Sequence, residues 1–215
     1  GAILAIALGI TVAVLDGAIA NVALPTIARD LNASAATSVW IVNAYQLAIT
    51  ISLLSLASLG DIIGYRKVYL TGLLVFSVTS LGCAMSDSLW TLTLARVLQG
   101  FGAAAVMSVN VALVRLIYPQ RHLGRGMGIN ALIVAVSAAA GPSVAAAILS
   151  VSSWPWLFAV NVPIGIAAFI CGMKFLPQNP PKVGKPKFDV YSALLNALTF
   201  GLLISAISGF AQRQN

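Results

Sequence analysis

Long apolar runs, separated by short polar breaks, dominate the pattern of the chain. A helix needs about 20 apolar residues to cross a hydrocarbon core about 30 Å thick, so each run of that length predicts a membrane-spanning helix. We place seven spans, at residues 3–25, 39–60, 68–86, 89–116, 127–150, 157–176 and 190–211. The expected fold class is an all-α membrane protein.

The composition agrees with this pattern. Hydrophobic residues make up 60% of the chain and charged residues only 8%, whereas roughly a quarter of the residues in soluble domains are charged. Twelve Lys and Arg against five acids give a formal net charge of +7. The basic residues gather in alternate loops, so we interpret the excess as membrane topology, with no nucleic acid as a partner.

The loops on the two sides of the predicted membrane differ in charge. Only Arg29 and Arg213 fall on one side, and nine basic residues fall on the other: Arg66, Lys67, Arg115, Arg121, Arg125, Lys174, Lys182, Lys185 and Lys187. By the positive-inside rule this distribution predicts a cytoplasmic amino terminus. Tryptophans near the outer span ends fit an aromatic belt: Trp40, Trp90, Trp154 and Trp156.

One break in composition divides the chain into domains. Residues 177–189 contain four prolines and three lysines, which cannot continue a helix. We therefore expect a six-helix bundle over 1–176, a cytoplasmic linker over 177–189, and a seventh helix within 190–215. The start at Gly1 without a basic leader argues against a cleavable signal peptide. The absence of an initiator Met suggests a fragment of a longer chain.

Two charges lie deep inside the predicted spans, away from the span ends: Asp16 in the first and Arg96 in the fourth. A carboxylate at bilayer depth costs at least about 2.5 kcal/mol, so it is expected to face the bundle interior and to have a partner. At 1.5 Å per residue, Asp16 lies about 12–14 Å from the outer end of its span and Arg96 about 9–11 Å. An ion pair is geometrically possible, and it is either a static structural pair or a site that titrates or binds.

Small residues in the fourth and fifth spans indicate close helix packing. Gly100 and Gly102 belong to the fourth span, and the fifth contains the run 137–146. Pro142 is expected to kink the fifth span at mid-membrane and to free a backbone carbonyl.

Little in the sequence indicates an enzyme. His122 is the single histidine, and Cys83 and Cys171 lie in apolar runs without a CxxC spacing, which favours buried free thiols over a disulfide or metal site. The sequence shows no nucleophile–base pair and no phosphate-binding loop, and the glycines of residues 124–128 follow no predicted strand. We expect no enzyme, no metal and no cofactor.

Several motifs occur in order along the chain. Residues 15–25, LDGAIANVALP, match a first-span signature in which Ala18 replaces the usual Thr. Residues 57–67, ASLGDIIGYRK, match a cytoplasmic gating loop at Asp61, Gly64, Arg66 and Lys67, and depart from it at Ala57, Ile62 and Tyr65. A glycine suits the tight turn, and the carboxylate of Asp61 suits a helix amino terminus in another half of the protein.

Three further motifs follow. Residues 94–104, LARVLQGFGAA, match a fourth-span motif around Arg96. Residues 137–146 match an antiporter motif centred on Gly141 and Pro142, with Ser137, Ala145 and Ala146 where glycine is usual. Residues 154–165, WPWLFAVNVPIG, match the start of a sixth span, with Pro155 for Arg. Together these motifs resemble the amino-terminal half of the major facilitator superfamily, specifically its fourteen-helix drug:proton antiporters.

The resemblance implies a bundle of two inverted three-helix repeats that rocks about a central cavity, with Asp16 and Arg96 accessible to the water of that cavity. It implies that Asp16 binds and releases a proton, the coupling ion, while Arg96 modulates the affinity of Asp16 for that proton. It also implies that lipophilic cationic drugs are exported across the bacterial inner membrane. Candidate cavity residues are Asn21, Trp40, Asn43, Tyr45, Gln46, Gln99 and Asn110. Each of these serves equally well in an interhelical hydrogen bond.

Two alternatives remain open. One is proton symport or facilitated transport of a small metabolite, in which Arg96 binds a substrate anion. The other is a non-transporting membrane module, if the natural chain is this short, because alternating access needs two bundles. The expected partners are the lipid bilayer, a small-molecule substrate and the missing carboxy-terminal half.

Overall fold

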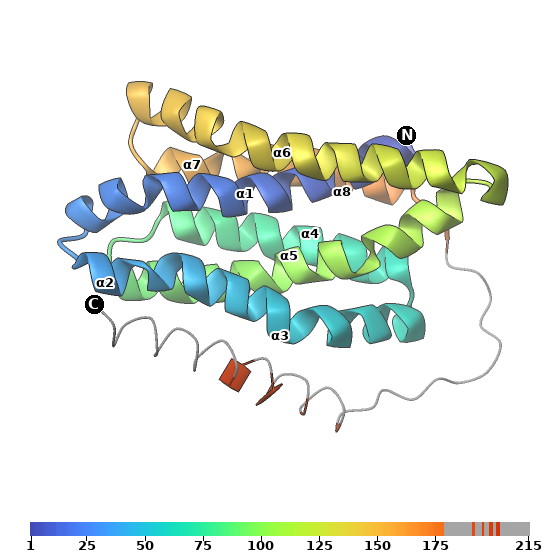
Figure 1. Cartoon of the computed structure of the whole chain (residues 1–215), viewed down its shortest axis with the longest axis horizontal. Helices are drawn as coiled ribbons and strands as arrows, with labels where there is room; N and C mark the ends of the chain where they lie inside the picture. Colours follow the sequence, from blue (N-terminus) through green and yellow to red (C-terminus); the bar gives the residue numbers. More distant parts are fainter. Residues whose placement is uncertain (179–190, 192–194, 196–197, 200, 203–215) are drawn as a thin grey trace.

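The computed structural model of the chain describes residues 1–178, 191, 195, 198–199 and 201–202 (Figure 1). Over these residues the regular elements are helical, and six helical stretches are long and apolar enough to span a membrane. The helices are α1 (Ala2–Asp30), α2 (Ala35–Ser38), α3 (Trp40–Ile63), α4 (Tyr65–Ala84), α5 (Leu89–Ile117), α6 (Leu123–Val151), α7 (Pro155–Ala159) and α8 (Asn161–Phe175), with the 3-10 turn η1 (Gln120–His122). The expected all-α class is confirmed.

The spans run up and down through a single bundle, so that alternate turns meet at the same end (Figure 1). The α3–α4 and α5–α6 turns and the end of α8 lie at the end that also holds the amino terminus. We call this the basic end, because it carries Arg66, Lys67, Arg115, Arg121, Arg125 and Lys174. Which side of a membrane it faces stays a prediction.

The first span is longer than expected. The apolar run predicted an end at Pro25, but α1 continues through this proline to Asp30. Two contacts hold the additional turn. Ile27 is fully buried in a hydrophobic cluster, and the Trp154 indole Nε1 donates to Asp30 Oδ2 at 2.8 Å. Tertiary packing therefore outweighs the missing proline N–H donor.

The turn between the second and third spans is shorter than the predicted span bounds indicated, because it consists of one residue. Gly64, with a φ of 106°, separates α3 from α4. This value lies in the region that favours glycine, so the expected tight turn is present at the expected glycine.

The sixth span is divided into α7 and α8. Pro163 lies in the first turn of α8 and has no backbone N–H with which to bond the carbonyl of Ala159, the last residue of α7. The division makes Asn161 the first residue of α8, and Asn161 is completely buried.

Glycines allow the helices around the centre to approach closely, as the sequence predicted. A Cβ on Gly102 of α5 would lie 2.6 Å from the Phe76 nitrogen of α4, and one on Gly100 would lie 2.7 Å from the Tyr45 carbonyl oxygen of α3. A Cβ on Gly141 of α6 would overlap Ala18 of α1. Although Pro142 follows, α6 remains one helix from Leu123 to Val151.

The predicted linker at 177–189 and the seventh span at 190–211 lie, apart from a few single positions, outside the described residues. The domain division of the sequence analysis therefore stays a prediction.

Candidate functional site

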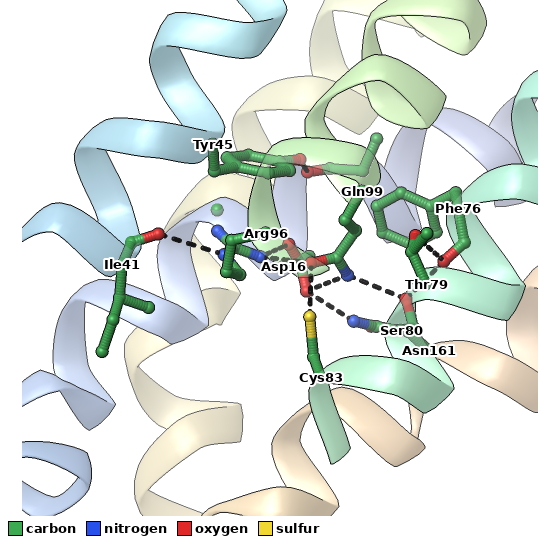
Figure 2. Close-up of polar contacts among 12 residues, drawn as sticks. Asp16, Ile41, Tyr45, Phe76, Thr79, Ser80, Cys83, Arg96, Gln99 and Asn161 are labelled. Atoms are coloured by element: carbon green, nitrogen blue, oxygen red, sulfur yellow. Dashed lines mark hydrogen bonds and ion pairs between the residues drawn. The ribbon is translucent and has the colours of Figure 1, made fainter. Parts of the chain in front are cut away.

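Asp16 lies at the middle of α1 and forms an ion pair with Arg96 of α5 (Figure 2). The Arg96 Nη1 and Asp16 Oδ2 atoms are 2.5 Å apart, and the two side chains are 0% and 1% exposed, respectively. The similar depths inferred from the sequence allowed this pairing, and the structure contains it. A buried pair of this kind is compensated only if further hydrogen bonds satisfy its remaining polar atoms.

Gln99, one turn after Arg96, supplies several of these bonds. Its Nε2 donates to Asp16 Oδ1 at 3.1 Å and to Ser80 Oγ of α4 at 2.8 Å. Its Oε1 accepts from Arg96 Nη1 at 2.6 Å and from the Cys83 thiol at 3.5 Å. Four partners therefore fix both ends of the Gln99 amide, and they link α4 to the ion pair.

Asn161 of α8 approaches the carboxylate from another side of the bundle (Figure 2). Its Nδ2 donates to Asp16 Oδ1 at 2.6 Å. Asp16 of α1 thus accepts from three side chains, two on α5 and one on α8, and α4 joins the network through Gln99. Because a carboxylate has acceptors only, each of these contacts is favourable for the charged form.

Aromatic rings and a backbone carbonyl surround Arg96. Its Nε donates to the Ile41 carbonyl oxygen at 3.3 Å, and its Cζ lies 3.9 Å from the centre of the Tyr45 ring and 5.6 Å from that of Phe158. Nη2 is buried and has no hydrogen-bond partner within the described part of the chain. The rings replace some of the water that the guanidinium gives up on burial.

Water access to the pair differs from the expectation. From the resemblance we expected water of the cavity to reach Asp16 and Arg96, whereas both side chains are buried away from solvent in this conformation. The covering rings of Tyr45 and Phe158 are 1% exposed each. A proton or ligand reaches Asp16 only if the bundle changes its conformation. In the described ranges no three His, Cys, Asp or Glu side chains gather to hold a metal ion.

Of the seven residues predicted to line a cavity, three are buried and four are exposed or partly buried. Tyr45 and Gln99 belong to the buried Asp16–Arg96 network, and Asn110 is buried elsewhere on α5 with its Oδ1 unpartnered among the described residues. Trp40 is 43% exposed, Asn43 is partly buried, and Asn21 and Gln46 are exposed. Asn21 bonds its own helix at the Gly17 carbonyl. Their roles in substrate binding stay predictions.

The residues of the predicted gating loop gather at the basic end. Tyr65, which replaces a motif residue, donates its hydroxyl to Asp61 Oδ1 at 2.6 Å. Arg66 Nη2 donates to the Met173 carbonyl near the end of α8, where a cation also complements the helix dipole. Lys67 is exposed and Gly64 makes the turn. Gating by this loop stays a prediction.

Sequence reasoning did not assign Ser80, Cys83, Phe158 or Asn161 to the site. For Asn161 a signal was present, because it is a polar residue directly after an apolar run and two positions before a proline. Polar residues within spans mark functional or interhelical contacts. Ser80 and Cys83 carry no comparable signal, because small polar residues are common in spans.

Comparison with known proteins identifies the family of this chain. A model of the Major Facilitator Superfamily matches residues 6–212. The chain belongs to the Major Facilitator Superfamily, a family of membrane transporters.

Three curated relatives are similar along most of this chain. The uncharacterized transporter YebQ of Escherichia coli (strain K12) is 68% identical over 215 residues, which is 100% of this chain and 47% of that protein. The riboflavin transporter RibZ of Clostridioides difficile (strain 630) is 34% identical, over 94% of this chain and 44% of that protein. The tetracenomycin C resistance and export protein of Streptomyces glaucescens is 35% identical, over 90% and 36%. The chain thus spans about half the length of these relatives, or less.

A solved structure agrees in fold. The crystal structure of a bacterial homologue of the human lysosomal transporter Spinster, inward-facing and unoccupied, aligns with a TM-score of 0.69 and 16% identity. The alignment covers 89% of this chain and 46% of that one. At this identity the likeness concerns the fold, which is that of a transporter bundle.

Proposed function

We propose that this chain forms the proton-coupling bundle of an exporter that exchanges protons for lipophilic cations across the bacterial inner membrane. The observation that carries the proposal is the desolvated carboxylate of Asp16, held by Arg96 at 2.5 Å in the centre of the bundle. Carboxylates at this depth mark ion and proton pathways. Export by a relative at 35% identity supports the direction of transport.

The chemistry follows from two opposing influences on one carboxylate. Burial disfavours its charged form, and three N–H donors, one of them on the cation Arg96, favour that form. A change in the contact between α1 and α5 within the bundle, made as the bundle rocks, alters this balance, so that Asp16 takes up a proton on one side of the membrane and releases it on the other. A lipophilic cation competes with the proton, because each neutralises the same charge.

The exchange requires a second bundle. Alternating access in this family is a motion of one bundle against another about a shared site near the bilayer midplane. The described chain supplies six spans. We propose that the facing bundle comes from the sequence that the longer relatives possess and that it completes the substrate pocket.

The test uses everted membrane vesicles from cells that express the complete natural gene product. An imposed proton gradient is expected to drive uptake of a fluorescent lipophilic cation, and a protonophore is expected to abolish it. Asp16→Asn should remove the gradient dependence, whereas Asp87→Asn, the same change at an exposed acid in a loop, should retain it. Gradient-driven uptake that persists in Asp16→Asn would contradict the proposal.

A second candidate is the transport of a small metabolite. The riboflavin transporter at 34% identity favours it, and the unpartnered Nη2 of Arg96 offers a donor to an anionic or neutral polar group. Two results together would support this candidate over drug export. A labelled metabolite should accumulate in intact cells and fail to do so in Arg96→Gln, and lipophilic cations should not be transported.

A further inference from the structure

Two amide side chains contact Asp16, and they differ in how tightly they are held. Gln99 has partners at both its nitrogen and its oxygen. Asn161 makes one hydrogen bond, from Nδ2 to Asp16 Oδ1 at 2.6 Å. Its Oδ1 is buried and finds no partner among the described residues. An unsatisfied buried acceptor costs free energy, so its presence in a site calls for an explanation.

The carboxylate of Asp16 is surrounded by donors. Oδ2 faces Arg96 Nη1, and Oδ1 faces the amide nitrogens of Gln99 and Asn161. A proton added to either oxygen turns that oxygen into an O–H donor. None of the three groups that now bond Asp16 offers it an acceptor, so the protonated acid requires a rearrangement.

Asn161 is the group that can rearrange at least cost. Rotation of its carboxamide by half a turn about Cβ–Cγ exchanges Nδ2 for Oδ1 and forfeits one hydrogen bond, which the new bond from the acid replaces. The same rotation of Gln99 would break its bonds to Ser80, Arg96 and Cys83 as well. Asn161 is the first residue of α8, directly after its division from α7.

We propose that Asn161 is a positioning residue for the proton on Asp16. Its amide donates to the carboxylate and, after rotation, accepts from the protonated acid through the oxygen that is now unpartnered. This inference rests on the proposed function, in which Asp16 takes up a proton. No covalent bond changes except that the incoming proton binds an Asp16 oxygen.

The other ionisable groups around Asp16 come from three helices. Arg96 of α5 faces it directly, and Tyr45 of α3 and Cys83 of α4 lie beside that pair. From α8 and α7 the neighbours are Asn161 and Phe158, which do not titrate. The contacts of α6 with α1 involve Ser137 and Gly141, which are uncharged. Protonation of Asp16 therefore leaves the adjacent Arg96 charge without its partner.

The test is infrared difference spectroscopy of the complete natural gene product in lipid, titrated between neutral and acidic pH. The band of the protonated Asp16 carboxyl is identified by its loss in Asp16→Asn. Asn161→Leu has a similar size but no acceptor, so the O–H of protonated Asp16 loses its partner and its carboxyl C=O band should lie at higher frequency than in wild type. Asn161→Ser keeps a hydroxyl that donates or accepts, and should shift this band less.

A matched control is Asn130→Leu in α6, where another amide oxygen is buried without a partner among the described residues. It should leave the frequency of the Asp16 carboxyl band unchanged. If Asn161→Leu does not fold, the wild-type protein still gives an answer. The Asn161 amide carbonyl band, assigned by difference from Asn161→Ser, should move to lower frequency on acidification as its oxygen gains a hydrogen bond.

The outcomes separate this inference from the function beneath it. An Asp16 carboxyl band at the same frequency in wild type and Asn161→Leu, or an Asn161 carbonyl band that does not change with pH, overturns the role of Asn161 and leaves the proton site standing. The complete absence of a titrating Asp16 band overturns both.

Discussion

The guanidinium carbon of Arg96 lies 3.9 Å from the centre of the Tyr45 ring, deep between α5 and α3. The same tyrosine donates its hydroxyl to the Ala13 carbonyl oxygen of α1 at 3.0 Å. One side chain therefore covers the buried cation and also ties two helices of the bundle together. The ring face and the hydroxyl make separable contributions.

Tyr45→Phe removes only the hydroxyl, and we expect a loss of about 1 kcal/mol, the net value of one buried hydrogen bond. Tyr45→Leu also removes the ring, and a desolvated cation–π contact adds roughly 2 kcal/mol. In thermal unfolding of the complete natural gene product in detergent, the wild type should therefore be more stable than Tyr45→Phe, and Tyr45→Phe should be clearly more stable than Tyr45→Leu. Equal losses in the two variants would show that the ring face does not stabilise Arg96.

The approach of α4 and α5 depends on Gly102, whose hypothetical Cβ would lie 2.6 Å from a backbone nitrogen. Backbone cannot yield as a flexible side chain can, so Gly102→Ala should lower stability by about 1–3 kcal/mol. Gly124→Ala is the matched control, because nothing lies within 4 Å of its Cβ. Thermal unfolding in detergent checks both, and an equal response of the two glycines would contradict this packing.

The additional turn of α1 beyond Pro25 should depend on the hydrogen bond from Trp154 to Asp30. Trp154→Phe preserves an aromatic ring against Phe158 but removes the indole donor, and should cost about 1–2 kcal/mol. Asp30→Asn keeps an acceptor oxygen and should cost less. Hydrogen exchange of the amides at residues 27–30 measures the turn directly. Unchanged protection in Trp154→Phe would assign the turn to packing of Ile27 alone.

Cys83 reports whether water enters the site. Its thiol is fully buried and donates to Gln99, whereas Cys171 is partly buried on α8. In the sealed conformation a small water-soluble thiol reagent should not modify Cys83 in a Cys171→Ala background. Addition of a lipophilic cation should open the bundle and raise the labelling rate at least tenfold. Rapid labelling without any substrate would contradict the sealed arrangement.

The length of the apolar runs and the placement of charges predicted much of this molecule from the sequence. The six described spans follow from apolar run length, and the scarcity and similar depth of the two buried charges made the Asp16–Arg96 pair geometrically possible. These features are local, or follow from a strong energetic penalty, so the sequence pattern contains them.

Other features could not be predicted because they depend on tertiary contacts. The end of α1 depends on Ile27 packing and on Trp154, which is distant in sequence. The place of Ser80 depends on the crossing of α4 over α5, which lets its hydroxyl accept from Gln99. Asn161 became significant only when the division of α7 from α8 placed its amide against Asp16.

Proton release on substrate binding tests the central claim most directly. The purified natural gene product, in weakly buffered detergent solution at neutral to mildly acidic pH, is mixed with tetraphenylphosphonium while the pH is recorded. If the cation competes with a proton on Asp16, its addition acidifies the solution, and Asp16→Asn abolishes the release while Asp87→Asn preserves it. Proton release of equal size in wild type and Asp16→Asn would place the exchange at another group and contradict the account.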